Sequence, residues 1–212
     1  MTADQLTIVP ILNGQFAENC YLVAATGSPT AVIVDPGEEP ARFLTEASRR
    51  GLQIREIWLT HAHIDHISGV AAIKQATGAP VFLHPADRTW YDTLAQQAAF
   101  FGLRAEPAPP PDRSLAHGDQ MDVGPVRFEV RHTPGHSAGS VCFIAPGIVL
   151  GGDVLFQGSI GRTDLPGGNH EQLLQSIRDE LLVLPDDTVV YPGHGPPTTI
   201  GAERLTNPFL LD

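Results

Sequence analysis

Three histidines and one aspartate fall within six positions of this chain: His61, His63, Asp65 and His66. They come just after the apolar run 57–59, which has the composition of a buried strand. In an extended segment, residues two apart point to the same side, so His61 and His63 project together. Packing so many polar groups into one small volume is costly unless they share a cation. The pattern therefore predicts a metal site.

Three later positions supply further candidate ligands: His136, Asp153 and His194. A glycine stands immediately before each of them, and glycine lets the backbone approach a site closely. Two metals a few ångströms apart share one bridging carboxylate, and we expect Asp153 to be the bridge. Asp35 lies at the end of another expected strand, and we expect it to accept a hydrogen bond from a ligand imidazole.

The remaining histidines have no such context. His84, His117, His132 and His170 occur singly, and a lone histidine is more often structural than a ligand. His84 and His132 lie near expected strand ends, which leaves open a place beside the site.

These candidate residues depend on the elements that would position them. Each follows an expected strand, and sites in layered α/β folds collect at strand ends. The chain is expected to form one domain, 1–212, with two β-rich halves that face each other. A proline-rich loop is expected over 105–118. We expect strands at 6–12, 20–25, 31–34, 54–59, 80–83, 126–131, 141–145, 148–150 and 188–191, and helices at 40–50, 65–77, 85–101 and from the Asn169 cap to about 184.

Composition narrows the function classes. The formal net charge of −11 argues against nucleic acid as a partner, because phosphate binding needs clustered basic residues. The first residues lack the features of a signal peptide, and no apolar run of about 18 residues predicts a membrane helix. We expect a cytoplasmic protein with no membrane contact. Cys20 and Cys142 lie in apolar runs and are expected to be buried free thiols.

The motifs T-H-A-H-I-D-H, T-P-G-H-S-A-G-S, G-G-D and Y-P-G-H-G resemble, in the same order, those of the metallo-β-lactamase superfamily. The resemblance covers nearly the whole chain. It implies an α/β fold, a four-layer αββα sandwich, with two divalent metals at one edge. It also implies the ligand sets: His61, His63 and His136 for the first metal, Asp65, His66 and His194 for the second, and Asp153 as the bridge.

Within the superfamily, residues 18–23, 156–169 and 207–210 are similar to those of short glyoxalase II-like hydrolases. This resemblance implies a thioesterase that cleaves S-lactoylglutathione or a similar small acyl thioester with a metal-bound hydroxide. Asp65 and Asp153 would be catalytic, and zinc is the expected metal, with iron or manganese as alternatives. Full-length glyoxalase II has a C-terminal helical domain that binds glutathione, and this sequence stops where that domain would begin. We expect a monomer or a small homo-oligomer.

Two other activities fit the same motifs. Persulfide dioxygenases also resemble this chain, including at the segment 161–164, and they hold one iron with residues matching His61, His136 and Asp153. A lactonase or a β-lactamase-like amidase would use the same ligands on another substrate. Arg162 is a candidate for contact with a substrate anion, and an ion pair with Asp164 is the alternative.

Overall fold

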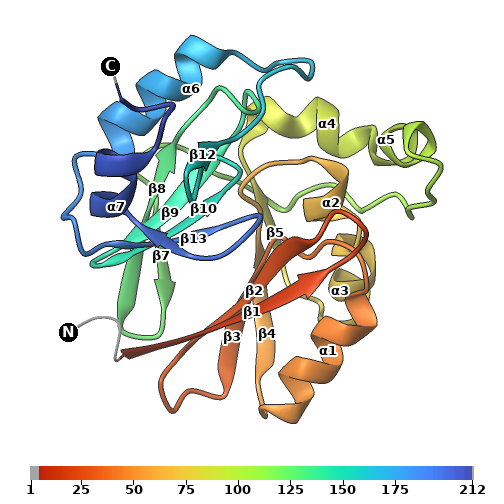
Figure 1. Cartoon of the computed structure of the whole chain (residues 1–212). Helices are drawn as coiled ribbons and strands as arrows, with labels where there is room; N and C mark the ends of the chain where they lie inside the picture. The colour runs from red at the N-terminus through yellow and green to blue at the C-terminus, as the bar shows by residue number, and fades with distance from the viewer. Residues whose placement is uncertain (1–4, 212) are drawn as a thin grey trace.

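Two mixed β-sheets form the centre of the molecule in a computed structural model, which describes residues 5–211 (Figure 1). The first sheet has the order β1-β2-β3-β4-β5-β6, and its last four strands run parallel. Its strands are β1 (Leu6–Asn13), β2 (Glu18–Ala25), β3 (Thr30–Val34), β4 (Gln53–Trp58), β5 (Val81–Leu83) and β6 (Arg113–Ser114).

The second sheet has the order β14-β13-β10-β9-β8-β7, and only β10 and β13 run parallel among its pairs. A separate short hairpin joins β11 to β12. These strands are β7 (Gln120–Val123), β8 (Val126–His132), β9 (Val141–Ala145), β10 (Ile148–Gly152), β11 (Leu155–Phe156), β12 (Ser159–Ile160), β13 (Val189–Pro192) and β14 (Thr198–Thr199).

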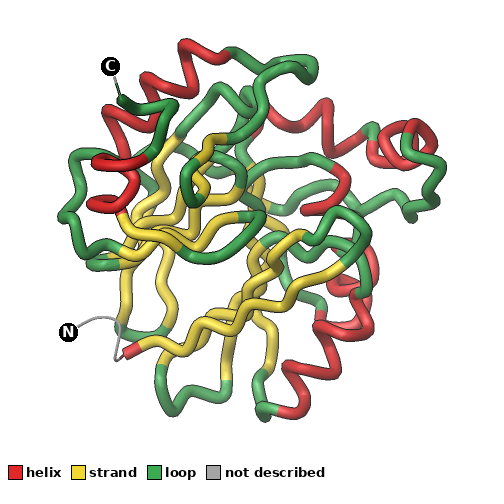
Figure 2. The backbone as a smooth tube through the Cα atoms, in the orientation of Figure 1, coloured by secondary structure: helices red, strands yellow, loops and turns green. Residues whose placement is uncertain are grey.

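Helices cover the outer face of each sheet (Figure 2). On the first sheet lie α1 (Pro40–Arg49), α2 (Ile64–Ile67), α3 (Val70–Thr77), the 3₁₀ turn η2 (Pro85–Asp87), α4 (Arg88–Asp92) and α5 (Leu94–Phe100). On the second lie α6 (His170–Ser176), the π-helical turn η3 (Ile177–Leu181) and α7 (Ile200–Thr206).

Three apolar clusters hold these layers together. The middle cluster fills the space between the sheets, where the Trp58 ring lies 5.0 Å from Phe143 and 5.7 Å from Phe128. The other two join each sheet to its helices. Aromatic rings bury a large apolar area each, so these contacts contribute strongly to the packing of the two sheets. The molecule is thus the four-layer αββα sandwich of the sequence-based expectation.

The structure corrects several expected elements. The helix expected over 65–77 is broken, because the backbone at Gly69 packs on Pro36 and Gly37; a Cβ there would lie 2.3 Å from the Gly37 carbonyl oxygen. The segment 85–101 consists of three short helical pieces, and the helix after Asn169 ends at Leu181 instead of about 184. The proline-rich loop contains β6, and β7, β11, β12, β14 and α7 were not expected.

The expected cap of α6 is present. The Asn169 side-chain oxygen accepts a hydrogen bond from the Gln172 backbone N–H at 3.0 Å. We predict that Asn169→Ala lowers the free energy of unfolding by about 1 kcal/mol, because one N–H of the first turn loses its acceptor. Urea unfolding of the metal-free protein measures this. Asn169→Asp keeps the acceptor and should unfold like the parent; a loss as large as that of the Ala variant would contradict the capping role.

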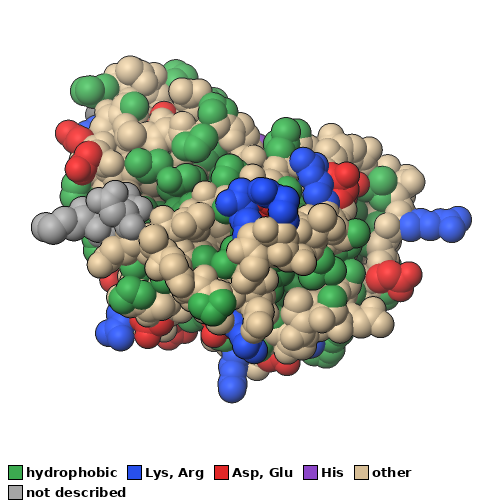
Figure 3. Space-filling model, turned by 90° about the horizontal axis from the view of Figure 1, so that it is seen from below, with side chains coloured by type: hydrophobic (Ala, Val, Ile, Leu, Met, Phe, Trp, Pro, Cys, Tyr) green, Lys and Arg blue, Asp and Glu red, His purple; other side chains and the backbone are tan. Residues whose placement is uncertain are grey.

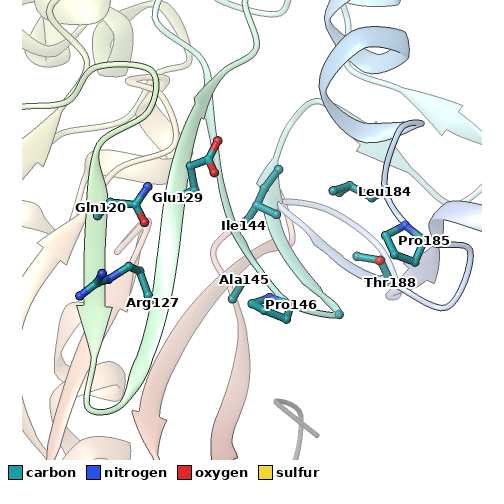
Figure 4. Close-up of a pocket in the computed structure, with 10 residues that line it drawn as sticks. Gln120, Arg127, Glu129, Ile144, Ala145, Pro146, Leu184, Pro185 and Thr188 are labelled. Atoms are coloured by element: carbon teal, nitrogen blue, oxygen red, sulfur yellow. The ribbon is translucent and has the colours of Figure 1, made fainter.

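One hollow, of about 360 Å³, lies on the outer face of the second sheet near the β9–β10 turn (Figure 4). Ile144, Pro146, Leu184 and Pro185 are among its lining residues. Since Gly147 precedes β10 and Asp153 follows it, this hollow and the histidine cluster lie at opposite ends of that strand. On the face seen from below, basic side chains occur in small groups among acidic, apolar and neutral ones (Figure 3). Between residues 5 and 211, no helix is both long and apolar enough to cross a bilayer.

Candidate metal centre

The first group of converging side chains is His61, His63 and His136. His136 Nε2 lies 3.2 Å from His61 Nε2 and 2.9 Å from His63 Nδ1, and all three rings are buried. Neutral imidazoles offer one acceptor nitrogen each, so three nitrogens that point at one another are suited to a shared cation. Residues from β4's end and from the loop after β8 meet here because Val141 N donates to the Thr60 carbonyl between the two sheets.

The second group is Asp65, His66 and His194. Asp65 Oδ2 lies 3.2 Å from His194 Nε2 and 3.7 Å from His66 Nε2. Asp65 and His66 lie within the short helix α2, whereas His194 follows β13. One carboxylate oxygen and two imidazole nitrogens of this group lie close enough together to hold one ion.

Asp153 lies between the two groups. Its Oδ2 is 3.6 Å from His136 Nε2 and 3.4 Å from His194 Nε2, and its Oδ1 is 3.4 Å from His66 Nε2. Gly152 has a φ of +49°, and a Cβ there would lie 2.3 Å from Thr60 Oγ1. Glycine is therefore required at this position for β10 to bring Asp153 against the histidines.

Unpartnered polar atoms show that a cation fits here. His66 Nε2 and Asp153 Oδ1 are fully buried, and neither has a hydrogen-bond partner among the described residues. A buried polar atom without a partner costs about 1–3 kcal/mol, so structures seldom retain one without a ligand or water. Imidazole and carboxylate ligands accept zinc, iron or manganese.

The outer nitrogens of the ligand histidines are also held. Asp35 Oδ2 lies 3.1 Å from His66 Nδ1, which is the contact expected of it, and its carboxylate accepts from Thr60 N and Thr60 Oγ1 at 2.7 and 2.6 Å. Asp35 has a φ of +50°, an uncommon conformation for a residue with a side chain. His194 Nδ1 lies 3.1 Å from the Phe16 carbonyl oxygen. A donated Nδ1–H leaves Nε2 free to bind a metal.

The pKa shifts of the candidate ligands differ between the two groups. Burial, followed by the neighbouring histidines, lowers the pKa of His61 well below its ordinary value, and burial lowers that of His63 to about 3. Burial also acts against the charged form of His194, but hydrogen bonds to Asp153 and Asp65 raise its pKa to about 10. Burial raises the pKa of the Asp153 carboxyl, yet His66 and His194 bring it well below the usual range. Without metal, His61 and His63 are therefore neutral, whereas His194 and Asp153 are charged.

Asn19 and Tyr21 lie in the segment 18–23 that resembles glyoxalase II-like hydrolases, but the sequence does not indicate what they contact. Asn19 Nδ2 donates to the carbonyls of Pro192 and Gly195 at 3.1 and 2.8 Å, and Tyr21 Oη donates to the Pro192 carbonyl at 2.6 Å. These bonds fix the loop that carries His194. Nothing about an asparagine and a tyrosine near position 20 predicts contact with residues more than 170 positions away.

The structure shows the contacts of Arg162 and of the two histidines His84 and His132. The Arg162 guanidinium forms a two-bond ion pair with Asp164, at 2.7 and 2.8 Å, so its contact with a substrate stays a prediction. The Arg162 carbonyl instead lies 2.8 Å from His136 Nδ1. Outside the ligand groups, His84 and His132 stack at 4.2 Å. Burial and the neighbouring His132 lower the pKa of His84 to about 4, so it is neutral at physiological pH.

A family model described as the metallo-beta-lactamase superfamily matches residues 13–194, which include every candidate ligand. The chain belongs to this superfamily. Its members are hydrolases or related metalloenzymes that bind divalent metals.

Relatives and solved structures extend the comparison. "Hydroxyacylglutathione hydrolase GloC" of Haemophilus influenzae is 38% identical, over 97% of each chain. "BLEG-1 B3 metallo-beta-lactamase" has a TM-score of 0.91 at 41% identity, over 97% of this chain and 100% of that one. TTHA1623, solved "in a di-iron-bound form", has a TM-score of 0.88 at 44% identity, over 95% and 100%. ETHE1 from Myxococcus xanthus has a TM-score of 0.80 at 29% identity, over 95% and 83%.

Proposed function

We propose that this chain is a binuclear metal-dependent hydrolase that cleaves small acyl thioesters, with S-lactoylglutathione as the reference substrate. The observation that carries the binuclear centre is the position of Asp153, whose Oδ2 lies 3.6 Å from His136 Nε2 and 3.4 Å from His194 Nε2. The likeness to GloC, across almost the full length of both chains, supports the thioester. Zinc is the proposed metal, with iron or manganese as alternatives.

When bound, divalent ions lower the pKa of water from about 16 to about 7 and polarise a carbonyl group. Several of the protein's own residues have the charge that metal binding requires. His61 and His63 are neutral, as metal ligands must be, because burial lowers the pKa of both. Asp65 and Asp153 supply two negative charges beside His66 and His194, and so balance part of the metal charge.

A thioester substrate is consistent with this site because its leaving group needs no proton donor. A thiolate leaves without a proton donor because the pKa of its conjugate acid is about 8.5. An amide nitrogen would need a donor near the site. Two aromatic side chains border the ligands: Trp90 lies 4.9 Å from His63, and Phe156 lies 6.1 Å from His194, measured between ring centroids. We propose that these rings exclude water from the acyl group.

Thiol release from S-lactoylglutathione tests the proposal. The protein is loaded separately with zinc, manganese or ferrous iron, and its metal content is measured before each assay. Two metals per chain with thiol release would support the binuclear thioesterase. Cleavage of a β-lactam without thiol release would replace it with an amidase. One iron per chain, with consumption of dissolved oxygen when glutathione persulfide is added and with no hydrolysis, would replace it with the dioxygenase.

The charged form of His194 predicts that the affinity of the second metal site depends on pH. In the metal-free protein His194 holds a proton at neutral pH, because hydrogen bonds to Asp153 and Asp65 outweigh burial and raise its pKa to about 10. A metal must displace this proton, so we predict that affinity for the second ion increases with pH from 6 to 9, about tenfold per unit for each proton displaced. His63, with a pKa of about 3, is already neutral over that range, so the first ion should bind with little pH dependence from this group.

Zinc titration calorimetry, repeated in two buffers of different ionisation enthalpy, measures the released protons. His194→Ala provides the comparison, since it removes one of the two imidazoles that must lose a proton and should make the pH dependence shallower. Equal affinities for the second ion at pH 6 and pH 9 would contradict the prediction.

A further inference from the structure

Two buried polar side chains, from η2 and α5, form hydrogen bonds with the backbone of Ala62 in the histidine motif. Asp87 Oδ2 accepts a hydrogen bond from the Ala62 N–H at 2.9 Å, and Gln97 Nε2 donates to the Ala62 carbonyl at 3.1 Å. Asp87 is 0% exposed and Gln97 is 7% exposed. Because Ala62 lies between His61 and His63, both peptide groups that orient these two ligands are held.

The same carboxylate also holds the loop of the third ligand. Asp87 Oδ2 accepts from Ser137 Oγ at 2.8 Å, and Asp87 Oδ1 accepts from the Gly139 N–H at 2.6 Å. Ser137 follows His136 directly. A Cβ on Gly139 would lie 2.6 Å from the Asp87 backbone nitrogen, so this close approach requires glycine there.

Asp87 therefore connects two loops that come from different sheets. His61 and His63 follow β4 of the first sheet, whereas His136 follows β8 of the second. The three ligand nitrogens converge at 2.9 and 3.2 Å, and their separation depends on how these loops are placed relative to each other. Metal sites need ligand placement within about 0.5 Å, so a buried bridge between the loops bears directly on affinity.

We propose that Asp87 is a positioning residue that fixes the spacing of His61, His63 and His136 and thereby sets the affinity of the first metal site. It touches neither the metal nor the substrate. The inference rests on the metal centre of the proposed function and is independent of the substrate. The carboxylate of Asp87 accepts its hydrogen bonds from Ala62, Ser137 and Gly139, and these residues flank ligands of the first site, so the second site should keep its affinity.

Glu203 provides a matched control. It is 1% exposed, and its carboxylate accepts three hydrogen bonds, from Gly158 N, Thr198 Oγ1 and Asn207 Nδ2, like the three that Asp87 accepts. These partners lie around α7 and β12 and include no candidate ligand. Asp87→Asn and Glu203→Gln thus remove comparable buried carboxylates, one beside the first triad and one away from it.

The test measures cobalt(II) affinity and visible absorption in two backgrounds. His194→Ala impairs the second site and reports on the first; His61→Ala impairs the first and reports on the second. Asp87→Asn should weaken cobalt binding about tenfold or more, and change the absorption bands, only in the His194→Ala background. Glu203→Gln should leave both affinities unchanged while lowering the melting temperature comparably.

Should Asp87→Asn fail to fold, Ser137→Ala removes one donor and keeps the carboxylate; a weaker shift in the same direction is then expected. Unchanged affinity at the first site in both variants would overturn the role of Asp87. An equal loss at both sites would do the same, because it would indicate a general structural effect. Failure of the parent protein to bind two metals would instead count against the binuclear centre.

Discussion

Asp153→Asn is expected to abolish thioester hydrolysis, with kcat at least about a thousandfold below that of the parent, while the protein stays folded. The Asp153 carboxylate lies between both ligand groups, with Oδ2 3.6 Å from His136 Nε2 and Oδ1 3.4 Å from His66 Nε2. The amide keeps the size of the side chain but removes its negative charge. A thousandfold loss corresponds to about 4 kcal/mol of transition-state stabilisation.

Steady-state thiol release and metal content measure this result together. We expect fewer than two metals per chain, because the bridging oxygen becomes a neutral amide. Asp164→Asn is the control: its carboxylate pairs with Arg162 on the surface and contacts no candidate ligand. Turnover of Asp153→Asn within tenfold of the parent would contradict the bridging role, provided that circular dichroism shows the same fold.

The convergence of the candidate ligands could be predicted because local spacing and strand order carry it. His61 and His63 follow β4, Asp153 follows β10 and His194 follows β13, and the structure brings all four together. β4 ends in the apolar residues Ile57 and Trp58, and β10 and β13 begin with apolar residues, which favours strands in a core. The αββα layers are implied by the resemblance of the motifs to the metallo-β-lactamase superfamily, and that prediction is confirmed.

The supports of the site could not be predicted in the same way. Asp87 lies in the sequence H-P-A-D, which is typical of an exposed first helical turn, yet its side chain is completely buried. Its position depends on contacts with Ala62 and Gly139, and no local pattern encodes a distance between loops. The break at Gly69 has the same origin, since it depends on how closely the 36–37 backbone approaches.

Electrostatics connects the two halves of the site. In the metal-free protein the carboxylates of Asp65 and Asp153 stabilise protons on His66 and His194. Two divalent ions would take over this role and expel those protons. The first triad has no such substitute, because burial keeps His61 and His63 neutral with or without an ion. The loops of this triad are held by the hydrogen bonds that Asp87 accepts from Ala62 N, Ser137 Oγ and Gly139 N.

Gly193→Ala is expected to destroy the second metal site. A Cβ at this position would lie 2.2 Å from Asp153 Oδ1 and 2.7 Å from His66 Cε1, so the methyl group would displace two candidate ligands. The backbone cannot shift away easily: Gly193 N donates to the Gly152 carbonyl at 2.8 Å, and the Gly193 carbonyl accepts from Asn19 N at 2.7 Å. We expect about one metal per chain, a loss of activity of a hundredfold or more, and about 1–3 kcal/mol lower stability from overpacking.

Metal analysis, kcat and urea unfolding of the same preparation separate these effects. Gly151→Ala is the control, because a Cβ there would meet Val190 Cγ1 at an ordinary 3.4 Å, and this glycine too lies in the buried approach to Asp153. It should keep two metals and near-parental turnover. If Gly193→Ala also kept two metals, the loop of His194 would have to yield despite its two backbone bonds, and the close packing of Asp153, His66 and Gly193 would not be what fixes the second site.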